Sequence, residues 1–127
     1  MNSVESTVRA YFDALNSSDV DGIVGLFAEE GSLMRDESDT LTGRQQIRSV
    51  FESMFQTIRG QRELYIDHIR QGGEVGAALT HTSGTVTILA NGNTIPVKSR
   101  ELFVLRKSAD GWLITDYMFN RPGSATP

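Results

Sequence analysis

The fold is decided by residues 42–69, TGRQQIRSVFESMFQTIRGQRELYIDHI, where one periodicity gives way to another. Before Gly60 the apolar residues recur every three or four positions, which predicts an amphipathic helix with the apolar stripe Ile47, Val50, Phe51, Met54, Phe55 and Ile58. After Gly60 polar and apolar residues alternate with a period of two, which is typical of a strand. Thr42 and Gln45 have the spacing of a capping box, so we expect the helix to begin beside them.

Two further helices are predicted upstream of this stretch. The first begins near Ser3 and ends at residues 16–18, with the apolar stripe Val4, Val8, Tyr11, Phe12 and Leu15. The second begins at Ser18 or Asp19, and its apolar residues are Val20, Ile23, Val24 and Phe27. Residues 31–43, GSLMRDESDTLTG, are short and polar at the centre, which favours a small hairpin or two edge strands.

Downstream, three turn signals separate four strands. The turns are Gly72-Gly73, Asn91-Gly92 and Ala109-Asp110-Gly111, and the strands occupy about 64–69, 75–89, 94–107 and 112–120. Consecutive strands joined by short turns form an antiparallel meander. The fold class is therefore α+β, with three N-terminal helices packed on one face of a curved, mostly antiparallel sheet.

The 127 residues form one domain by length, because surface scaling lets a chain of this size bury about two thirds of its surface in one core. We expect the domain to span residues 1–121, and residues 122–127 to form a flexible tail. The chain has no cysteine and two histidines, His68 and His81, so neither a metal site nor a cofactor is expected.

A net charge of −4 argues against nucleic acid as a partner. No stretch has the roughly 20 apolar residues of a membrane span, and the N-terminus lacks the pattern of a secretion signal, so the expected location is the cytoplasm without membrane contact. Both faces of the strand at 94–107 are apolar, with Leu102 and Val104 on one and Phe103 and Leu105 on the other. A second copy of the chain is the economical cover for the outer face, which predicts a homodimer.

The order of elements and three stretches of sequence resemble the nuclear transport factor 2-like superfamily, which includes the SnoaL-like polyketide cyclases and ketosteroid isomerase. Residues 8–33, VRAYFDALNSSDVDGIVGLFAEEGSL, are similar to the first two helices and first strand of ketosteroid isomerase. Residues 41–55, LTGRQQIRSVFESMF, resemble the third helix, and residues 99–122, SRELFVLRKSADGWLITDYMFNRP, resemble the closing hairpin of the SgcJ/EcaC-like group. The resemblance implies a cone-shaped α+β barrel with an apolar cavity open at one end, and leaves the activity open.

The resemblance also places candidate residues in that cavity. Tyr11 falls where ketosteroid isomerase has the tyrosine that donates a hydrogen bond to an oxyanion. Arg35 stands at the position of the isomerase's general base and Asp36 follows it, and since arginine stays protonated, ketosteroid isomerisation itself is not expected. The second acid of the isomerase falls somewhere within residues 100–102, which are Arg100, Glu101 and Leu102, and the register stays open.

Asp116 is the alternative catalytic carboxylate. By a period of two it shares one face of the last strand with Trp112, Ile114 and Asn120, so it enters the cone if the tryptophan does. A desolvated carboxylate there could act as a general acid or base, as an acid does in this region of SnoaL-like cyclases. The competing interpretation is a salt bridge to Arg100 or Arg35 that only neutralises a half-buried charge.

The remaining candidates would bind the ligand rather than react with it. Arg35 and Arg100, if both project into the cone, would hold an anionic group with paired hydrogen bonds; alternatively they pair with Asp116 or Glu101 or face solvent. We expect His81 to add a hydrogen bond to the ligand, and Trp112 and Asn120 to complete the wall.

Two functions follow from this set. The first is an isomerase or cyclase without a cofactor that moves protons on an apolar, enolisable substrate, with Asp116 and Tyr11 as catalytic residues. The second is a domain that binds a small apolar or anionic ligand, or that dimerises, without catalysis. Displaced isomerase acids favour the second, and a polar cluster in an apolar cone favours the first.

Overall fold

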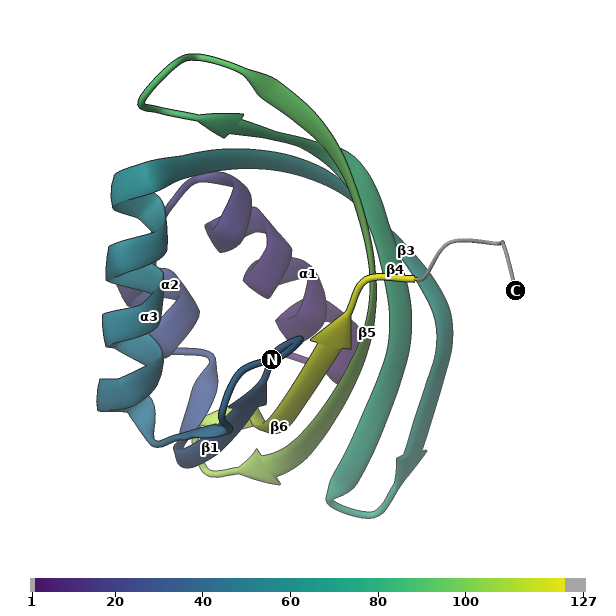
Figure 1. Ribbon diagram of the computed structural model, residues 1–127. Coiled ribbons are helices and arrows are strands. Elements are labelled where there is room, and N and C mark those ends of the chain that lie inside the picture. Colours follow the sequence, from purple (N-terminus) through teal and green to yellow (C-terminus); the bar gives the residue numbers. More distant parts are fainter. Residues whose placement is uncertain (1, 123–127) are drawn as a thin grey trace.

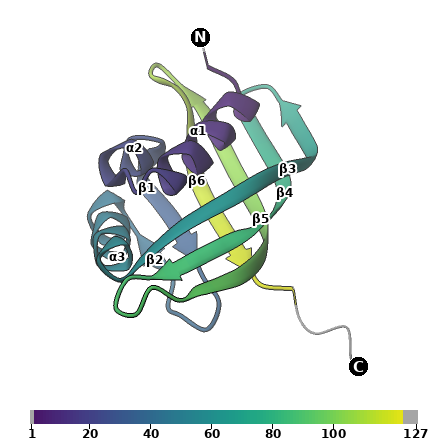
Figure 2. The same cartoon turned by 90° about the horizontal axis from the view of Figure 1, so that it is seen from above.

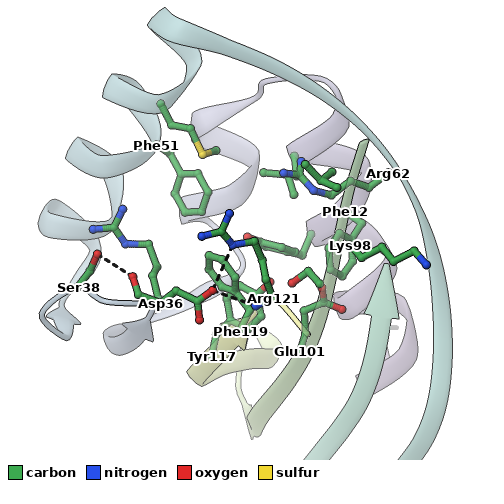
Figure 3. A pocket seen from close by; sticks show the side chains of 16 residues that line it. Phe12, Asp36, Ser38, Phe51, Arg62, Lys98, Glu101, Tyr117, Phe119 and Arg121 are labelled. Carbon is green, nitrogen blue, oxygen red and sulfur yellow. Dashed lines mark hydrogen bonds and ion pairs between the residues drawn. The ribbon is translucent and has the colours of Figure 1, made fainter. Parts of the chain in front are cut away.

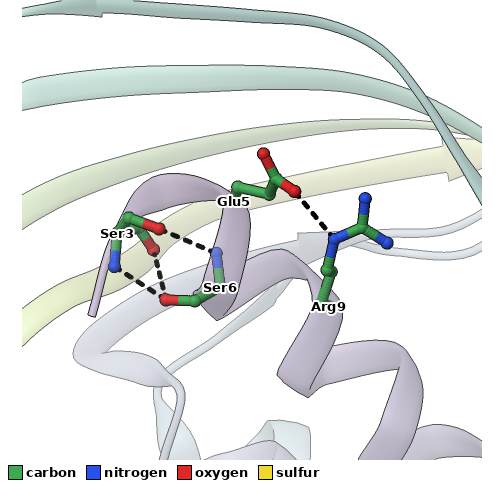
Figure 4. A network of polar contacts seen from close by, with 4 residues as sticks. All are labelled: Ser3, Glu5, Ser6 and Arg9. Atoms are coloured by element: carbon green, nitrogen blue, oxygen red, sulfur yellow. Dashed lines mark hydrogen bonds and ion pairs between the residues drawn. The ribbon is translucent and has the colours of Figure 1, made fainter. Parts of the chain in front are cut away.

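The first helix, α1, spans Val4–Asn16 in the computed structural model, which describes residues 2–122 (Figure 1). Ser3 caps it: the Ser3 side chain accepts from the Ser6 backbone N–H, and the Ser6 hydroxyl accepts from the Ser3 N–H (Figure 4). Glu5 and Arg9 add an ion pair of 2.9 Å on the exposed face. The opposite face buries the predicted stripe from Val4 to Leu15, so the sequence prediction for this helix is confirmed.

The second helix, α2, covers only Val20–Val24, because the glycine that follows, Gly25, does not favour a helix. Asp19 caps the N-terminus by accepting from the Gly22 N–H at 3.0 Å. The predicted helix was too long, since Gly25 ends it and Phe27 already begins the strand β1, Phe27–Met34. β1 pairs antiparallel with the short strand β2, Leu41–Thr42, which confirms the predicted hairpin.

The long helix, α3, spans Arg44–Thr57 and buries Ile47, Phe51 and Phe55. The predicted capping box is wrong. Thr42 belongs to β2, where it pairs with Ser32, and Gly43 occupies the N-cap position with a positive φ of 91° and no side-chain cap. The Thr42 N–H donates instead to Gln46 Oε1 at 2.9 Å, so the side chain one residue beyond Gln45 secures the start of the helix.

Four long strands follow α3: β3 (Ile58–Gly72), β4 (Val75–Ile88), β5 (Thr94–Ser108) and β6 (Gly111–Asn120). β3 begins directly after the last residue of α3, with no loop between them. Gly73, Gly92 and Gly111 take positive φ angles in the three turns, which is why glycine is found there. The strands form the predicted antiparallel meander, and the full sheet order is β2-β1-β6-β5-β4-β3, with β1 parallel to β6.

The sheet curves around the helices and stays open, so the cone is not a closed barrel (Figures 1 and 2). α1 lies against the concave face, and α3 spans the open side of the sheet between β1 and the start of β3 (Figure 1). The core between these layers contains a cluster of aromatic rings around Tyr11 together with aliphatic side chains. The fold thus places one helix inside a curved sheet, which confirms the predicted α+β architecture.

The convex face of the sheet carries apolar residues that the chain itself does not cover. Leu79, Leu102 and Met118 are paired neighbours across β4, β5 and β6, and each is at least 40% exposed. This row fits the expectation of a second copy, and the homodimer stays a prediction here. Apart from Pro122, the predicted tail lies outside the described residues. Within residues 2–122, no helix is long and apolar enough to cross a membrane.

Gly84 in β4 provides a test of the tight approach between β3 and β4. A Cβ on Gly84 would collide with the backbone of Gln61 and lie 2.8 Å from the Cα of Arg62. We expect Gly84→Ala to lower the free energy of unfolding by about 1–3 kcal/mol, because neither strand can move without breaking their ladder. Gly72→Ala, with no heavy atom within 4 Å, is the matched control and should change it by less than about 0.5 kcal/mol. Equal urea midpoints for the two variants would contradict this packing.

Candidate functional site

A cavity of about 290 Å³ lies between the concave face of the sheet and helices α1 and α3 (Figure 3). Apolar side chains from both helices and from β6 form most of its wall: Phe12, Leu15, Phe51, Met54 and Phe119. Polar and charged side chains interrupt this wall at Tyr11, Arg35, Asp36, Ser38, Arg62, Lys98, Ser99, Glu101, Tyr117 and Arg121, and Val97 completes the lining. A mostly apolar cavity with a few polar groups is typical of a small-molecule site.

Two buried tyrosines, Tyr11 and Tyr117, line the cavity. The ring of Tyr11 packs edge-to-face against Tyr117 at 5.0 Å, and Tyr117 stacks on Phe103 at 4.2 Å. Burial raises the pKa of both phenols well above their ordinary value, and the Tyr117 hydroxyl opposes that rise for Tyr11. Both phenols therefore stay protonated at neutral pH and can donate a hydrogen bond into the cavity.

Glu101 is the buried carboxylate of the cavity, with 2% of its surface exposed. Its Oε1 accepts from the Thr80 hydroxyl at 2.7 Å, and its Oε2 accepts from the Thr82 hydroxyl at 2.9 Å. Thr80 and Thr82 lie on β4, and Glu101 pairs directly with Thr80 across the sheet. Two neutral hydroxyl groups thus orient this carboxylate while leaving further lone pairs on both oxygens.

Sequence reasoning left Glu101 as one of three alternatives, although a signal in the chain selects it. Phe103 and Leu105 are fully buried on the inner face of β5, and a period of two from them reaches Glu101 and skips Arg100 and Leu102. The tyrosine at 117 gave no comparable signal, because its orientation depends on an irregularity in β6.

That irregularity corrects the prediction for Asp116. Val104 pairs with Asp116, but Leu105 pairs with Ile114, so Thr115 is an extra residue in β6. Trp112 and Ile114 face the core as expected, and beyond the bulge Tyr117 and Phe119 face inward instead. Asp116 therefore does not share the face of Trp112, and it lines a hollow on the convex side together with Glu30 and Arg106.

Three predicted binding residues lie on the convex face as well. Arg100 donates from Nε to Asn120 Oδ1 at 2.6 Å, and His81 pairs with Arg100 across the sheet. His81 stacks on Tyr65 at 4.9 Å, and its Nδ1 lies 3.0 Å from an oxygen of Asp67. The predicted cluster of Arg100, His81, Asn120 and Asp116 is therefore absent from the cavity, and Trp112 is a core residue that does not line it.

Of the predicted site residues, Tyr11 and Arg35 do line the cavity. Asp36 lines it too, because β1 ends at Met34 and strand alternation no longer separates neighbouring residues beyond that point. Asp36 accepts from the backbone N–H of Arg121 at 2.9 Å, and the Arg121 Nε lies 3.5 Å away (Figure 3). This pair joins the segment after β1 to the residue that follows β6.

Arg62 reaches the cavity from β3, opposite the helix that carries Phe51 (Figure 3). The backbone of Arg62 is fixed in both directions by the Asn16 side chain, at 2.9 Å each. Its guanidinium lies over Gly60, where a Cβ would collide with Nη1. As for metal ions, residues 2–122 contain no group of three or more histidine and carboxylate side chains that could hold one.

Comparisons with known proteins agree with this fold. The family model described as a SnoaL-like domain matches residues 8–117. A solved ketosteroid isomerase-like protein from Erwinia carotovora atroseptica is 28% identical, with a TM-score of 0.90 and 95% of each chain covered. An NTF2-like protein with a cystatin-like fold from Novosphingobium aromaticivorans is 17% identical, with a TM-score of 0.72, and the match covers 94% of this chain and 80% of the other. A search of curated proteins found no match.

The buried phenols make the stability of the protein sensitive to alkaline pH. Because the pKa of Tyr11 and Tyr117 is raised in the folded state, their contribution is fully present below pH 10 and is lost as the pH rises above it. We expect urea unfolding between pH 10 and 11.5 to show a loss that approaches about 1.4 kcal/mol per pH unit for each phenol. Tyr11→Phe and Tyr117→Phe should each reduce the dependence of the unfolding free energy on pH by the contribution of one phenol. A double variant with the wild-type slope would rule out this assignment.

Proposed function

The chain belongs to the SnoaL-like domain family, and from this premise we propose that it binds a small, planar, mostly apolar molecule in the cavity between α1, α3 and the sheet. The observation that carries the proposal is one cavity that combines aromatic walls with two buried phenols and one buried carboxylate. Aromatic walls favour a flat ligand, because ring edges and faces then make contact along its whole length. The volume of about 290 Å³ suits a compact molecule of one or two fused rings.

We further propose that the bound molecule is enolisable and that the site transfers protons on it without a cofactor. Glu101 takes a proton from a carbon next to a carbonyl group, the C–H electron pair moves into the carbonyl, and an enolate forms. Tyr11 or Tyr117 donates a hydrogen bond to the enolate oxygen. Where the substrate carries a C=C bond conjugated with the enolate, return of the proton to the far carbon of this dienolate shifts the double bond and gives an isomer. Glu101 thus takes the role that is predicted for Asp116 from the sequence, and Tyr11 keeps the role proposed for it.

Two observations support this assignment of roles. Glu101 is held by neutral hydroxyl groups rather than by a cation, so no positive partner competes for the carboxylate. The phenols are desolvated, which makes them stronger partners for developing negative charge than they would be in water. Arg35 stands where the resemblance placed the base of ketosteroid isomerase, so a reaction on steroids is not part of the proposal.

The test of proton transfer is deuterium exchange at the acidic carbon of 2-tetralone, a planar enolisable ketone, followed by ¹H NMR in D₂O. We expect the wild-type protein to accelerate the exchange, Glu101→Gln to abolish the acceleration, and Tyr11→Phe to reduce it by roughly 10-fold to 1,000-fold. The Gln side chain keeps the shape: its Oε1 can accept from one threonine hydroxyl, and its Nε2 can donate to the hydroxyl oxygen of the other, so loss of folding is not expected.

Asp116→Asn is the matched control, because it removes a carboxylate from the convex face and should leave the exchange rate unchanged. Exchange that persists in Glu101→Gln would refute Glu101 as the base. Binding of 2-tetralone without any accelerated exchange would instead support the alternative, a ligand-binding domain without catalysis.

We also propose that a second copy of the chain covers the convex face of the sheet. The row Leu79, Leu102 and Met118 is flanked by charges of both signs, with Arg100 and Arg106 on β5 and Asp67 and Asp116 on β3 and β6. A two-fold interface brings a surface against its own copy, so a face with both signs around an apolar row is complementary to itself.

Leu102 lies at the centre of this row, and Leu102→Glu tests it. We expect light scattering coupled to size-exclusion chromatography to give twice the chain mass for the wild type and the single-chain mass for Leu102→Glu. An exposed position for Leu102 in the single chain makes a folding defect unexpected, and the far-ultraviolet circular dichroism should not change. A monomeric wild type at about 50 μM would contradict the proposed interface.

A further inference from the structure

The charged residues that line the cavity are mostly positive, although the net charge of the chain is negative. The chain carries −4 overall, whereas the cavity is lined by the four cations Arg35, Arg62, Lys98 and Arg121 and by two carboxylates, Asp36 and Glu101. An excess of positive charge inside an acidic protein raises the potential of this one concave surface above that of its surroundings. Which of these cations already pair with a carboxylate of the protein decides which of them can bind a ligand.

Both carboxylates have partners that leave two of the arginines free. Asp36 interacts with Arg121, and Glu101 accepts from Thr80 and Thr82. Among residues 2–122, neither Arg35 nor Arg62 forms an ion pair, and neither guanidinium donates a hydrogen bond. Cations and a carboxylate thus line the same cavity without neutralising each other.

Arg35 has the more unusual surroundings of the two. Its Nε is buried, has no hydrogen-bond partner, and is the only such side-chain atom among the described residues. A buried N–H without an acceptor is costly, and the cost is larger for a charged group. The Nε–H and one Nη–H of a guanidinium are parallel, and this fork matches the two oxygens of a carboxylate.

We propose that the ligand of the cavity carries a carboxylate, and that the Nε side of Arg35 binds it. Arg62 adds positive potential from the β3 side, while the apolar rings of the ligand pack against Phe51 and Phe119. The inference rests on the proposed function, because it names the chemical class of the molecule that occupies the same cavity. The ligand class is therefore a planar aromatic or alicyclic carboxylic acid with an enolisable carbon.

The test compares two isosteric probes, 2-naphthoate and 2-naphthamide, by isothermal titration calorimetry at pH 7.5, where the first is ionised and the second is neutral. We expect 2-naphthoate to bind roughly 10-fold to 100-fold more tightly than 2-naphthamide, as for hydrogen bonds between charged groups. Arg35→Gln should bring the two affinities within about threefold of each other. Arg35→Lys, which keeps the charge but loses the fork, should recover only part of the difference.

Arg9→Gln is the matched control, since it removes an arginine that pairs with Glu5 on the exposed face of α1. It should leave both affinities unchanged. Arg62→Gln should weaken 2-naphthoate by a smaller factor than Arg35→Gln, and the thermal midpoints of all variants show whether they are folded.

The outcomes separate the two proposals. Equal binding of both probes to the wild type, or a preference for 2-naphthoate that survives in Arg35→Gln, would overturn the carboxylate inference and leave the binding function intact. Failure of both probes to bind would overturn the inference together with the binding function on which it rests. A preference lost equally in Arg9→Gln would show that the effect comes from the overall charge of the protein and would also overturn the inference.

Discussion

The burial of the Tyr11 ring is the interaction on which the rest of the structure depends. Edge-to-face contacts join this one side chain to rings on α1, β1, α3, β5 and β6: Phe12, Phe27, Phe51, Phe103 and Tyr117. Each such contact adds about 0.5–1.5 kcal/mol to the burial of its area. The ring lies on α1 and contacts both α3 and the sheet, so it sets the distance between these layers. The cavity is the space that remains beside the ring.

A bulge at Thr115 decides which side chains reach that space. Without the extra residue, Asp116 would follow Ile114 onto the inner face and Tyr117 would turn outward. With it, a second aromatic ring joins the cluster and the carboxylate of the cavity comes from Glu101 on β5 instead. One inserted residue thus exchanges an acid for a phenol on β6, which leaves four cations and two carboxylates in the lining of the cavity.

Most of the fold could be predicted from the sequence, because long periodic segments and glycine turns are local signals. The helical periodicity from Ile47 to Phe55 and the turn at Asn91-Gly92 each appear in the structure at the expected place, whereas Ile58, predicted as the end of the helical stripe, is the first residue of β3. The site could be predicted only in part. Tyr11 and Arg35 lie in the cavity as the resemblance implied, but a bulge leaves no mark in the alternation of β6, so Asp116 was assigned to the wrong face. The capping of α3 failed for a similar reason, since strand pairing at Thr42 overrides its local preference.

The NMR signals of the methionine methyl groups test most directly whether a small molecule binds in the cavity. Of the four methionines, Met54 lines the cavity and Met118 lies on the convex face, so the chain contains its own control. With methyl-¹³C methionine and 2-naphthoate, we expect a saturable shift of the Met54 signal, nuclear Overhauser contacts between its methyl group and the ligand ring, and an unchanged Met118 signal. Shifts confined to Met118, or no saturable shift at Met54 at millimolar ligand, would contradict binding in the cavity.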